Sequence, residues 1–142
     1  MDPSIITSDP ILRRLFEALH ALVAQDTAPW AALFTADGVM EFPYAPPGYP
    51  ARLEGWTAIE AYMQDYPSHI TLRQVHCDHA YRAGETRIVE FSARCTAVVT
   101  GRAFTMRYVA VITPEGDKIK TYRDYWNPLA AMTALGHMDA AQ

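Results

Sequence analysis

The sequence has few cysteines, no long apolar run and no excess of basic residues. Only Cys77 and Cys95 are present among 142 residues, which is too few for a zinc site or a disulfide scaffold, so both are expected to be reduced thiols. No segment approaches the roughly eighteen apolar residues of a membrane helix. A formal charge of −4 without a Lys or Arg cluster leaves nothing to neutralise a phosphate backbone. Neither nucleic acid nor a membrane is therefore expected as a partner.

The first ten residues also lack the basic and apolar segments of a secretory leader, since they contain two aspartates and two prolines. We therefore expect the cytoplasm as the location. Half of the residues are hydrophobic and 20% are charged, a composition typical of globular proteins. The length predicts a single domain over residues 1–142, with loose termini over 1–8 and 137–142.

Hydrophobic residues at helical spacing predict three helices in the first half of the chain. The first covers 10–23, with Ser8 or Asp9 as its N-cap. A shorter second helix is expected to reach Phe34 and to end at the turn signal of residues 36–38. The third follows Gly55, and Pro67 closes it.

After residue 67 the hydrophobic period changes to two, which predicts strands. A brief alternation in "VMEFPY" predicts one strand before the third helix, and four strand candidates follow that helix over 71–78, 87–101, 102–117 and 118–127. Helices followed by an antiparallel meander indicate an α+β fold. Such long strands must twist and curl, so the sheet is expected to form a cone over the helices, with a ligand cavity inside.

Three segments carry a resemblance to a known family: "WAALFTADGVMEFPY", "RLEGWTAIEAYM" and "GDKIKTYRDYWNPL". In their order and spacing the chain resembles the SnoaL-like branch of the nuclear transport factor 2-like superfamily. That superfamily includes ketosteroid isomerases, limonene epoxide hydrolases and PhzA/PhzB-type proteins. The resemblance covers nearly the whole chain and implies a cone-shaped α+β barrel of three helices on a strongly curved, mainly antiparallel sheet. It does not select one activity, because this scaffold supports many.

The resemblance also shows which known catalytic sets are missing. The base and the oxyanion-binding acid of ketosteroid isomerases correspond to Phe42 and Ala110 here. The arginine and partner aspartate of limonene epoxide hydrolases fall near Phe91 and Ala93, and only the last-strand acid is matched, by Asp124. PhzA/PhzB-type proteins have that acid too. SnoaL-type cyclases use one acid and a histidine in an apolar pocket for an aldol closure, a pattern that this sequence could still satisfy.

Strand alternation predicts the residues that face the cavity. Asp124 is its one acid, and Tyr108 and Tyr122 could donate hydrogen bonds to a developing enolate. His76, on the strand face of Leu72 and Gln74, is one candidate histidine, although a solvent or core position is the alternative. His69, after the third helix, is the remaining candidate, near the mouth of the cavity. The residues predicted to bind the ligand are Met40, Phe42, Tyr44, Tyr62, Phe91, Cys95, Met106 and Trp126. No metal site or cofactor is expected.

These residues indicate a cofactor-free enzyme of isomerase or cyclase type that acts on an apolar, ring-bearing ligand with Asp124 as acid or base. One alternative is a binding protein with the same cavity and no chemistry, in which Asp124 pairs with an arginine. Another is an epoxide hydrolase in which Glu90 or a histidine replaces the missing acid. The outer sheet face, with Arg94, Thr105, Arg107, Val109 and Tyr125, is predicted to form a homodimer.

Overall fold

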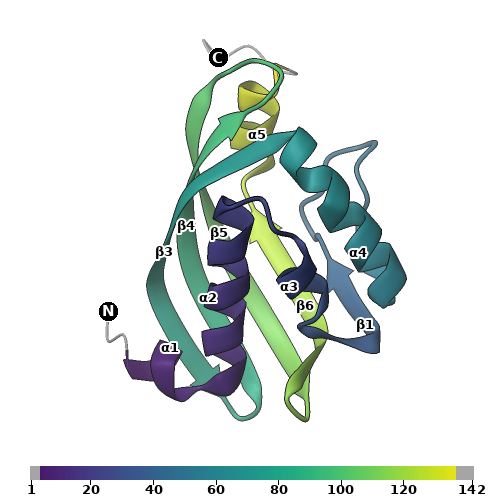
Figure 1. Cartoon of the computed structure of the whole chain (residues 1–142), viewed down its shortest axis with the longest axis vertical. Coiled ribbons are helices and arrows are strands. Elements are labelled where there is room, and N and C mark those ends of the chain that lie inside the picture. The colour runs from purple at the N-terminus through teal and green to yellow at the C-terminus, as the bar shows by residue number, and fades with distance from the viewer. Residues whose placement is uncertain (1–3, 137–142) are drawn as a thin grey trace.

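A single mixed sheet of six strands carries the fold, in the order β2-β1-β6-β5-β4-β3 (Figure 1). The computed structural model of the chain describes residues 4–136. The strands are β1 (Phe34–Glu41), β2 (Arg52–Glu54), β3 (Ile70–Ala83), β4 (Thr86–Ala97), β5 (Ala103–Glu115) and β6 (Lys118–Trp126). The helices are α1 (Ser4–Ser8), α2 (Pro10–Val23), α3 (Ala28–Ala31), α4 (Trp56–Asp65) and α5 (Pro128–Ala134), with a 3₁₀ turn over Tyr66–Ser68. All strand pairs are antiparallel except β1 with β6.

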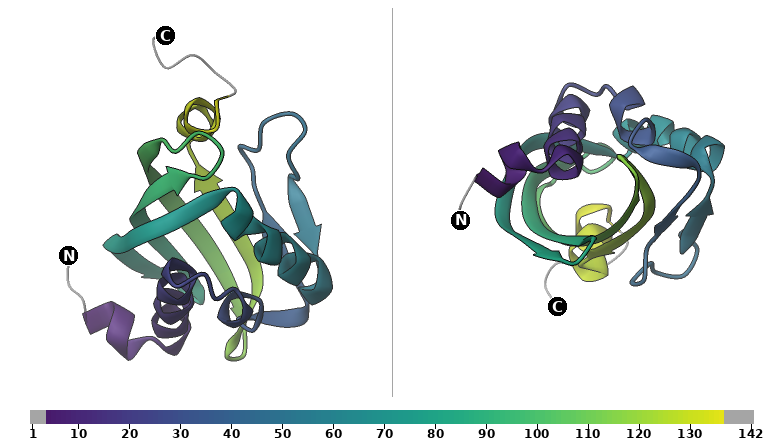
Figure 2. Two further views of the ribbon diagram at one scale, coloured as in Figure 1. Left: turned by 45° about the horizontal axis from the view of Figure 1, so that its top comes forward. Right: turned by 90° about the horizontal axis from the view of Figure 1, so that it is seen from below.

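The sheet curves strongly without closing. Seen along its length, strands β3 to β6 follow most of a ring, and α2 and α3 lie along the open side (Figure 2). Strands β3, β4 and β5 have 14, 12 and 13 residues, long enough for the right-handed twist to accumulate into this curvature. The predicted α+β fold, with helices on a curved and mainly antiparallel sheet, is confirmed.

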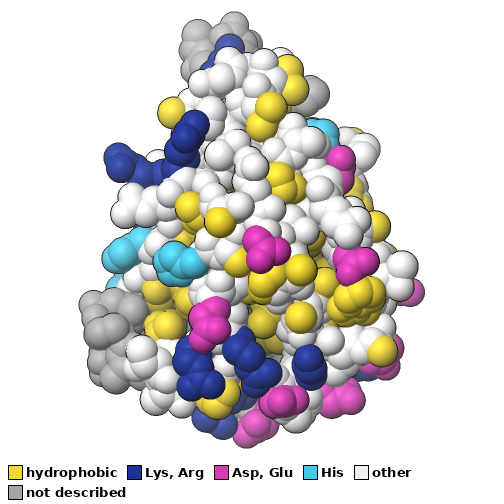
Figure 3. Space-filling view, in the orientation of Figure 1, with side chains coloured by type: hydrophobic (Ala, Val, Ile, Leu, Met, Phe, Trp, Pro, Cys, Tyr) yellow, Lys and Arg dark blue, Asp and Glu magenta, His cyan; other side chains and the backbone are white. Residues whose placement is uncertain are grey.

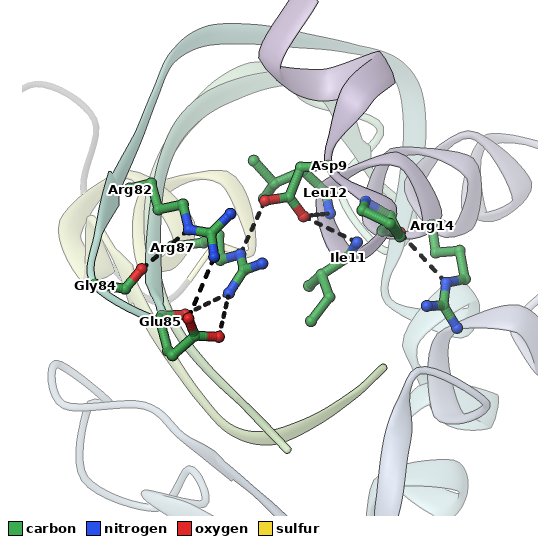
Figure 4. Close-up of polar contacts among 9 residues, drawn as sticks. Asp9, Ile11, Leu12, Arg14, Arg82, Gly84, Glu85 and Arg87 are labelled. Carbon is green, nitrogen blue, oxygen red and sulfur yellow. Dashed lines mark hydrogen bonds and ion pairs between the residues drawn. The ribbon is translucent and has the colours of Figure 1, made fainter. Parts of the chain in front are cut away.

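Helix α2 closes the open side with one apolar face. Its buried residues are Ile11, Leu12, Leu15, Phe16, Ala18, Leu19 and Leu22. Asp9 caps the helix, because its Oδ1 accepts hydrogen bonds from the backbone N–H groups of Ile11 and Leu12 at 3.0 and 3.3 Å. Its Oδ2 accepts a 2.9 Å hydrogen bond from Nε of the buried Arg87 at the start of β4 (Figure 4). One carboxylate therefore holds the helix N-terminus against the sheet.

Two predicted boundaries are wrong near the N-terminal half of the sheet. The second helix ends at Ala31, and residues 36–38, expected to be a turn, lie inside β1. The pairing of β1 with β6 shifts between Phe34 and Val39, and residues 36–38 lie within this irregularity, so the strand continues through them. Gly38 permits it, since a Cβ there would lie 3.0 Å from the Cβ of Phe34. The short strand β2 was not predicted.

The chain ends also differ in part from the expectation. Residues 4–8 form α1, where the sequence predicts a loose segment, whereas residues 137–142 lie outside the described part. Residues 128–134 form the short helix α5. No helix in the described residues is long and apolar enough to cross a membrane.

Charged side chains of both signs gather at one end of the molecule. Figure 3 shows Lys and Arg beside Asp and Glu along its lower edge, where the β3–β4 and β5–β6 hairpins lie in Figure 1. Arg14 lies 3.7 Å from Asp117 there, and Arg82 lies 3.3 Å from Glu85. Such exposed pairs stabilise the fold little. The mixture also means that this end presents no surface of a single sign.

Candidate functional site

A cavity of about 600 Å³ lies between the concave face of the sheet and the helices. Its walls come from β1, β3, β4, β5 and β6, from α2 and α4, and from α5 at one end. Exposed lining residues, among them Tyr49, Asp65, His69 and Val99, mark its mouth. The volume and the concave, ring-rich lining are those of a small-molecule site.

Asp124 is the acid inside this cavity. Strand alternation turns Tyr122, Asp124 and Trp126 of β6 to the concave side, and all three line the cavity. Asp124 pairs across the sheet with the fully buried Ala110 of β5, which offers it no polar group. Its Oδ1 is buried, and within residues 4–136 it has no hydrogen-bond partner. Burial raises the pKa of Asp124 from 3.8 to about 7.

Four tyrosines from separate parts of the fold surround Asp124. Burial raises the pKa of each of them, and the charge of Asp124 adds to the rise for Tyr62, Tyr66, Tyr108 and Tyr122. The pKa of Tyr62 rises to about 12. The hydroxyls of Tyr66 and Tyr108 also influence each other's pKa, so they lie close together. All four therefore stay protonated and present O–H donors near the acid.

Aromatic contacts hold these tyrosines in place. Tyr108 stacks on Phe91 with ring centroids 4.8 Å apart and planes at 16°. Tyr122 meets Trp30 edge-on at 5.3 Å. Tyr62 packs against Phe42 at 5.4 Å. Because each ring is fixed by another, the hydroxyl groups are positioned before a ligand arrives.

Most of the predicted ligand-binding residues line the cavity. Met40, Phe42, Tyr62, Phe91, Met106 and Trp126 do so, together with Asp124, Tyr108 and Tyr122. Cys95 shares their strand face but is 2% exposed and lies outside the lining. Burial raises the pKa of its thiol to about 12, so Cys95 is a buried apolar neighbour of the site.

His76 does not face the cavity, contrary to the strand-face prediction. Bulges in β3 between Leu72 and Gln74 and between Cys77 and His79 change the phase of the alternation. Leu72 and Val75 are therefore buried, and the side chain of His76 is 72% exposed on the outer face. Its Nδ1 lies 2.9 Å from Oδ1 of Asp78 there.

Tyr44 also lies outside the cavity. Strand β1 ends at Glu41, and Tyr44 follows in a turn where alternation no longer applies. Its side chain is 58% exposed and meets Tyr125 edge-on, with ring centroids 5.4 Å apart. The two rings line a second, shallow hollow on the outer face, which also contains Glu90.

Three parts of the lining were not predicted: Tyr66, Asp65 and helix α5. Tyr66 follows Tyr62 by four residues, a spacing that places both rings on one helix side. Asp65 and His69 are also four apart, and Nε2 of His69 lies 2.8 Å from Oδ2 of Asp65 at the mouth. Helix α5 contributes Ala131 and Met132, which no local pattern could assign to a cavity formed by distant strands.

The described residues contain no group of three or more His, Cys, Asp or Glu side chains that could hold a metal ion. The titratable groups that line the cavity are Asp124, the tyrosines and, at the mouth, Asp65 and His69. The chemistry that these side chains offer is transfer of a proton to or from Asp124, with hydroxyl donors beside it.

Comparisons with known proteins agree with this fold. The sequence profile of the SnoaL-like domain family matches residues 12–122. An uncharacterised PhzA/B-like protein of Pseudomonas aeruginosa is 38% identical over 128 residues, which are 89% of this chain and 91% of that protein. A crystal structure of a candidate isomerase from Bacillus subtilis is 35% identical with a TM-score of 0.86, covering 91% of this chain and 94% of that one.

More distant structures share the fold alone. An LEH-like epoxide hydrolase of M. tuberculosis has a TM-score of 0.66 at 17% identity, covering 89% of both chains. A candidate SnoaL-like polyketide cyclase of Mesorhizobium loti has a TM-score of 0.63 at 23% identity, covering 81% of this chain and 97% of that one. The same scaffold therefore occurs in proteins described by different activities.

Proposed function

Because the chain belongs to the SnoaL-like domain family, we propose that it is a cofactor-free enzyme of isomerase or cyclase type. Its substrate is an apolar, ring-bearing small molecule, and Asp124 transfers the proton. The observation that carries this proposal is the buried Oδ1 of Asp124, which no group of residues 4–136 satisfies. A buried acid without a partner destabilises the fold, and such groups concentrate at functional sites.

The pKa of Asp124 suits both directions of proton transfer. With a pKa of about 7, the carboxyl group is half ionised at neutral pH, so it can take up a proton and return it. The C–H bond beside a substrate carbonyl breaks, its proton moves to Asp124, and the electron pair moves onto the carbonyl oxygen. A hydroxyl of Tyr108 or Tyr122 donates to that oxygen. Return of the proton at another carbon gives isomerisation. Alternatively, the enolate carbon attacks a second carbonyl group and closes a ring, and the alkoxide formed there takes the proton back from Asp124.

Epoxide hydrolysis has less support. Phe91 and Ala93 stand where the resemblance places the second acid and its arginine, and both are buried apolar residues of β4. Glu90, the proposed substitute, lines the hollow on the outer face, and His76 is exposed there. Asp124 alone cannot activate water and protonate an epoxide in the same step.

Turnover of enolisable ring ketones tests the proposal, with Asp124→Asn as the variant and Asp117→Asn as the control. Asp117 lies exposed in the β5–β6 hairpin, so its variant removes the same charge far from the cavity. We expect Asp124→Asn to abolish turnover and keep the fold, and Asp117→Asn to behave as the parent protein. Activity retained in Asp124→Asn would refute the assignment. Binding without turnover in the parent protein would favour the non-catalytic alternative.

A further inference from the structure

The charges that line the cavity are unbalanced. The lining contains two carboxylates, Asp65 and Asp124, and none of the described residues in it is Lys or Arg. His69, the one basic group, lies at the mouth beside Asp65. Asp124, at the bottom, has no cationic partner among residues 4–136, and none of the salt bridges found there includes it. An anionic ligand would therefore meet an acid and no compensating cation.

Aromatic side chains line the cavity around the same acid. Tyr62, Tyr66, Tyr108 and Tyr122 lie close enough for the charge of Asp124 to raise the pKa of each hydroxyl. The indole of Trp126, two residues along β6, also lines the cavity. Aromatic faces attract cations through their quadrupole, most strongly where water is excluded. A carboxylate among several rings is a combination that favours a positively charged group.

We propose that the ligand of this cavity is an organic cation, a quaternary or protonated amine with an apolar body, whose nitrogen lies between Oδ1 of Asp124 and the surrounding rings. This inference adds one positively charged group to the otherwise apolar ligand of the proposed function. It rests on that function only in placing the ligand at Asp124, and binding tests it without turnover. It is compatible with proton transfer, because a neighbouring cation holds Asp124 in the ionised form that accepts a proton.

A matched pair of probes separates charge from shape. Benzyltrimethylammonium and neopentylbenzene have the same shape. They differ only in the atom that bears the three methyl groups, which is a positively charged nitrogen in the first and a neutral carbon in the second. Quenching of Trp30 and Trp126, which both line the cavity, reports binding. We expect the cation to bind about tenfold or more tightly than the neutral probe. Equal binding, tighter binding of the neutral probe, or no binding of the cation would overturn the inference.

Variants locate the charge that matters. Asp124→Asn keeps the shape of the side chain, and we expect it to remove the preference for the cation, so that both probes bind with similar affinity. Asp117→Asn, with the same change in net charge on the exposed hairpin, should keep the preference. A preference that survives in Asp124→Asn would contradict the role of this carboxylate. If the parent protein prefers the cation but turns over none of the ring ketones, that result would count against the proposed reaction and not against this inference.

Proton release gives an independent measurement. At pH 7 the carboxyl group of Asp124 is about half protonated in the empty cavity, since its pKa is about 7. A bound cation lowers that pKa, so binding should release about half a proton per site, seen by calorimetry in two buffers of different ionisation enthalpy. Tyr62, Tyr66, Tyr108 and Tyr122 line the same cavity and remain protonated at this pH, as does the neighbouring thiol of Cys95. Cation binding without proton release would refute contact with Asp124.

Discussion

Replacing Asp124 with asparagine should stabilise the folded protein at neutral and alkaline pH. The pKa of this carboxyl group is raised from 3.8 to about 7 by burial, so ionisation is less favourable in the folded chain than in the unfolded one. Between these two values the folded state binds more protons than the unfolded state. The contribution of Asp124 to stability is therefore lost as the pH rises from about 4 to about 7, and the loss is complete above that range.

The size of the effect follows from the difference between the two pKa values. A rise from 3.8 to about 7 is about three units, and at about 1.4 kcal/mol per unit the ionised carboxylate costs the fold about 4 kcal/mol. Asp124 is partly accessible from the cavity, and water there lowers the cost, so we expect about 2 to 4 kcal/mol. Domain stabilities are on the order of 5 to 15 kcal/mol, which makes this difference large.

Urea unfolding of the parent protein and of Asp124→Asn across this pH range measures the difference in stability. The free energy of unfolding of Asp124→Asn minus that of the parent should rise by about 2 to 4 kcal/mol between about pH 4 and about pH 8. All other titrating groups cancel in this difference, because both proteins contain them. A difference that does not change with pH would mean that Asp124 is solvated or paired in solution. A difference that falls with rising pH would mean that a cation stabilises it.

Two further predictions concern the N-terminal cap of α2 and the outer face of the sheet. Asp9→Ala should lower the free energy of unfolding by about 3 to 5 kcal/mol, since it removes the cap of α2 and leaves the buried Arg87 unpaired. The double variant with Arg87→Met should recover part of this loss, and chemical denaturation measures both values. The outer sheet face should form a homodimer. Val109→Glu, on the exposed side of β5, should therefore shift the mass measured by light scattering from that of a dimer to that of a monomer. Thr113→Glu, near the end of the same strand, should leave the mass unchanged. A monomeric parent protein would contradict that prediction.

The sequence predicted the site best where the strands are regular. Strands β4, β5 and β6 pair through most of their length without a shift, so simple alternation placed Phe91, Met106, Tyr108, Tyr122 and Asp124 on the concave side. A period of two is a local property, and it needs only an uninterrupted strand to be correct. The fold class followed from the same patterns together with the family resemblance.

Prediction failed where a strand is interrupted or where distant segments meet. The bulges of β3 and the shift in β1 are not encoded by the hydrophobic period, and a one-residue bulge such as that between Leu72 and Gln74 changes the phase of the side chains that follow it. His76 was misplaced for that reason. The contribution of α5 depends on where the curved sheet brings the chain end, and the order of residues in the sequence does not contain that information.

The missing catalytic residues of the wider superfamily explain why Asp124 has the chemistry proposed for it. Phe42, Phe91, Ala93 and Ala110 stand where the resemblance places the acids and the arginine of other members, and all four are buried and apolar. Each such replacement removes a charge or a hydrogen-bond partner from the surroundings of Asp124. Without an arginine its pKa is not lowered, and without a second acid no proton is shared, so burial alone sets the value near 7. The described lining thus contains one deeply buried acid, and under the inference above the group that balances its charge comes from the ligand.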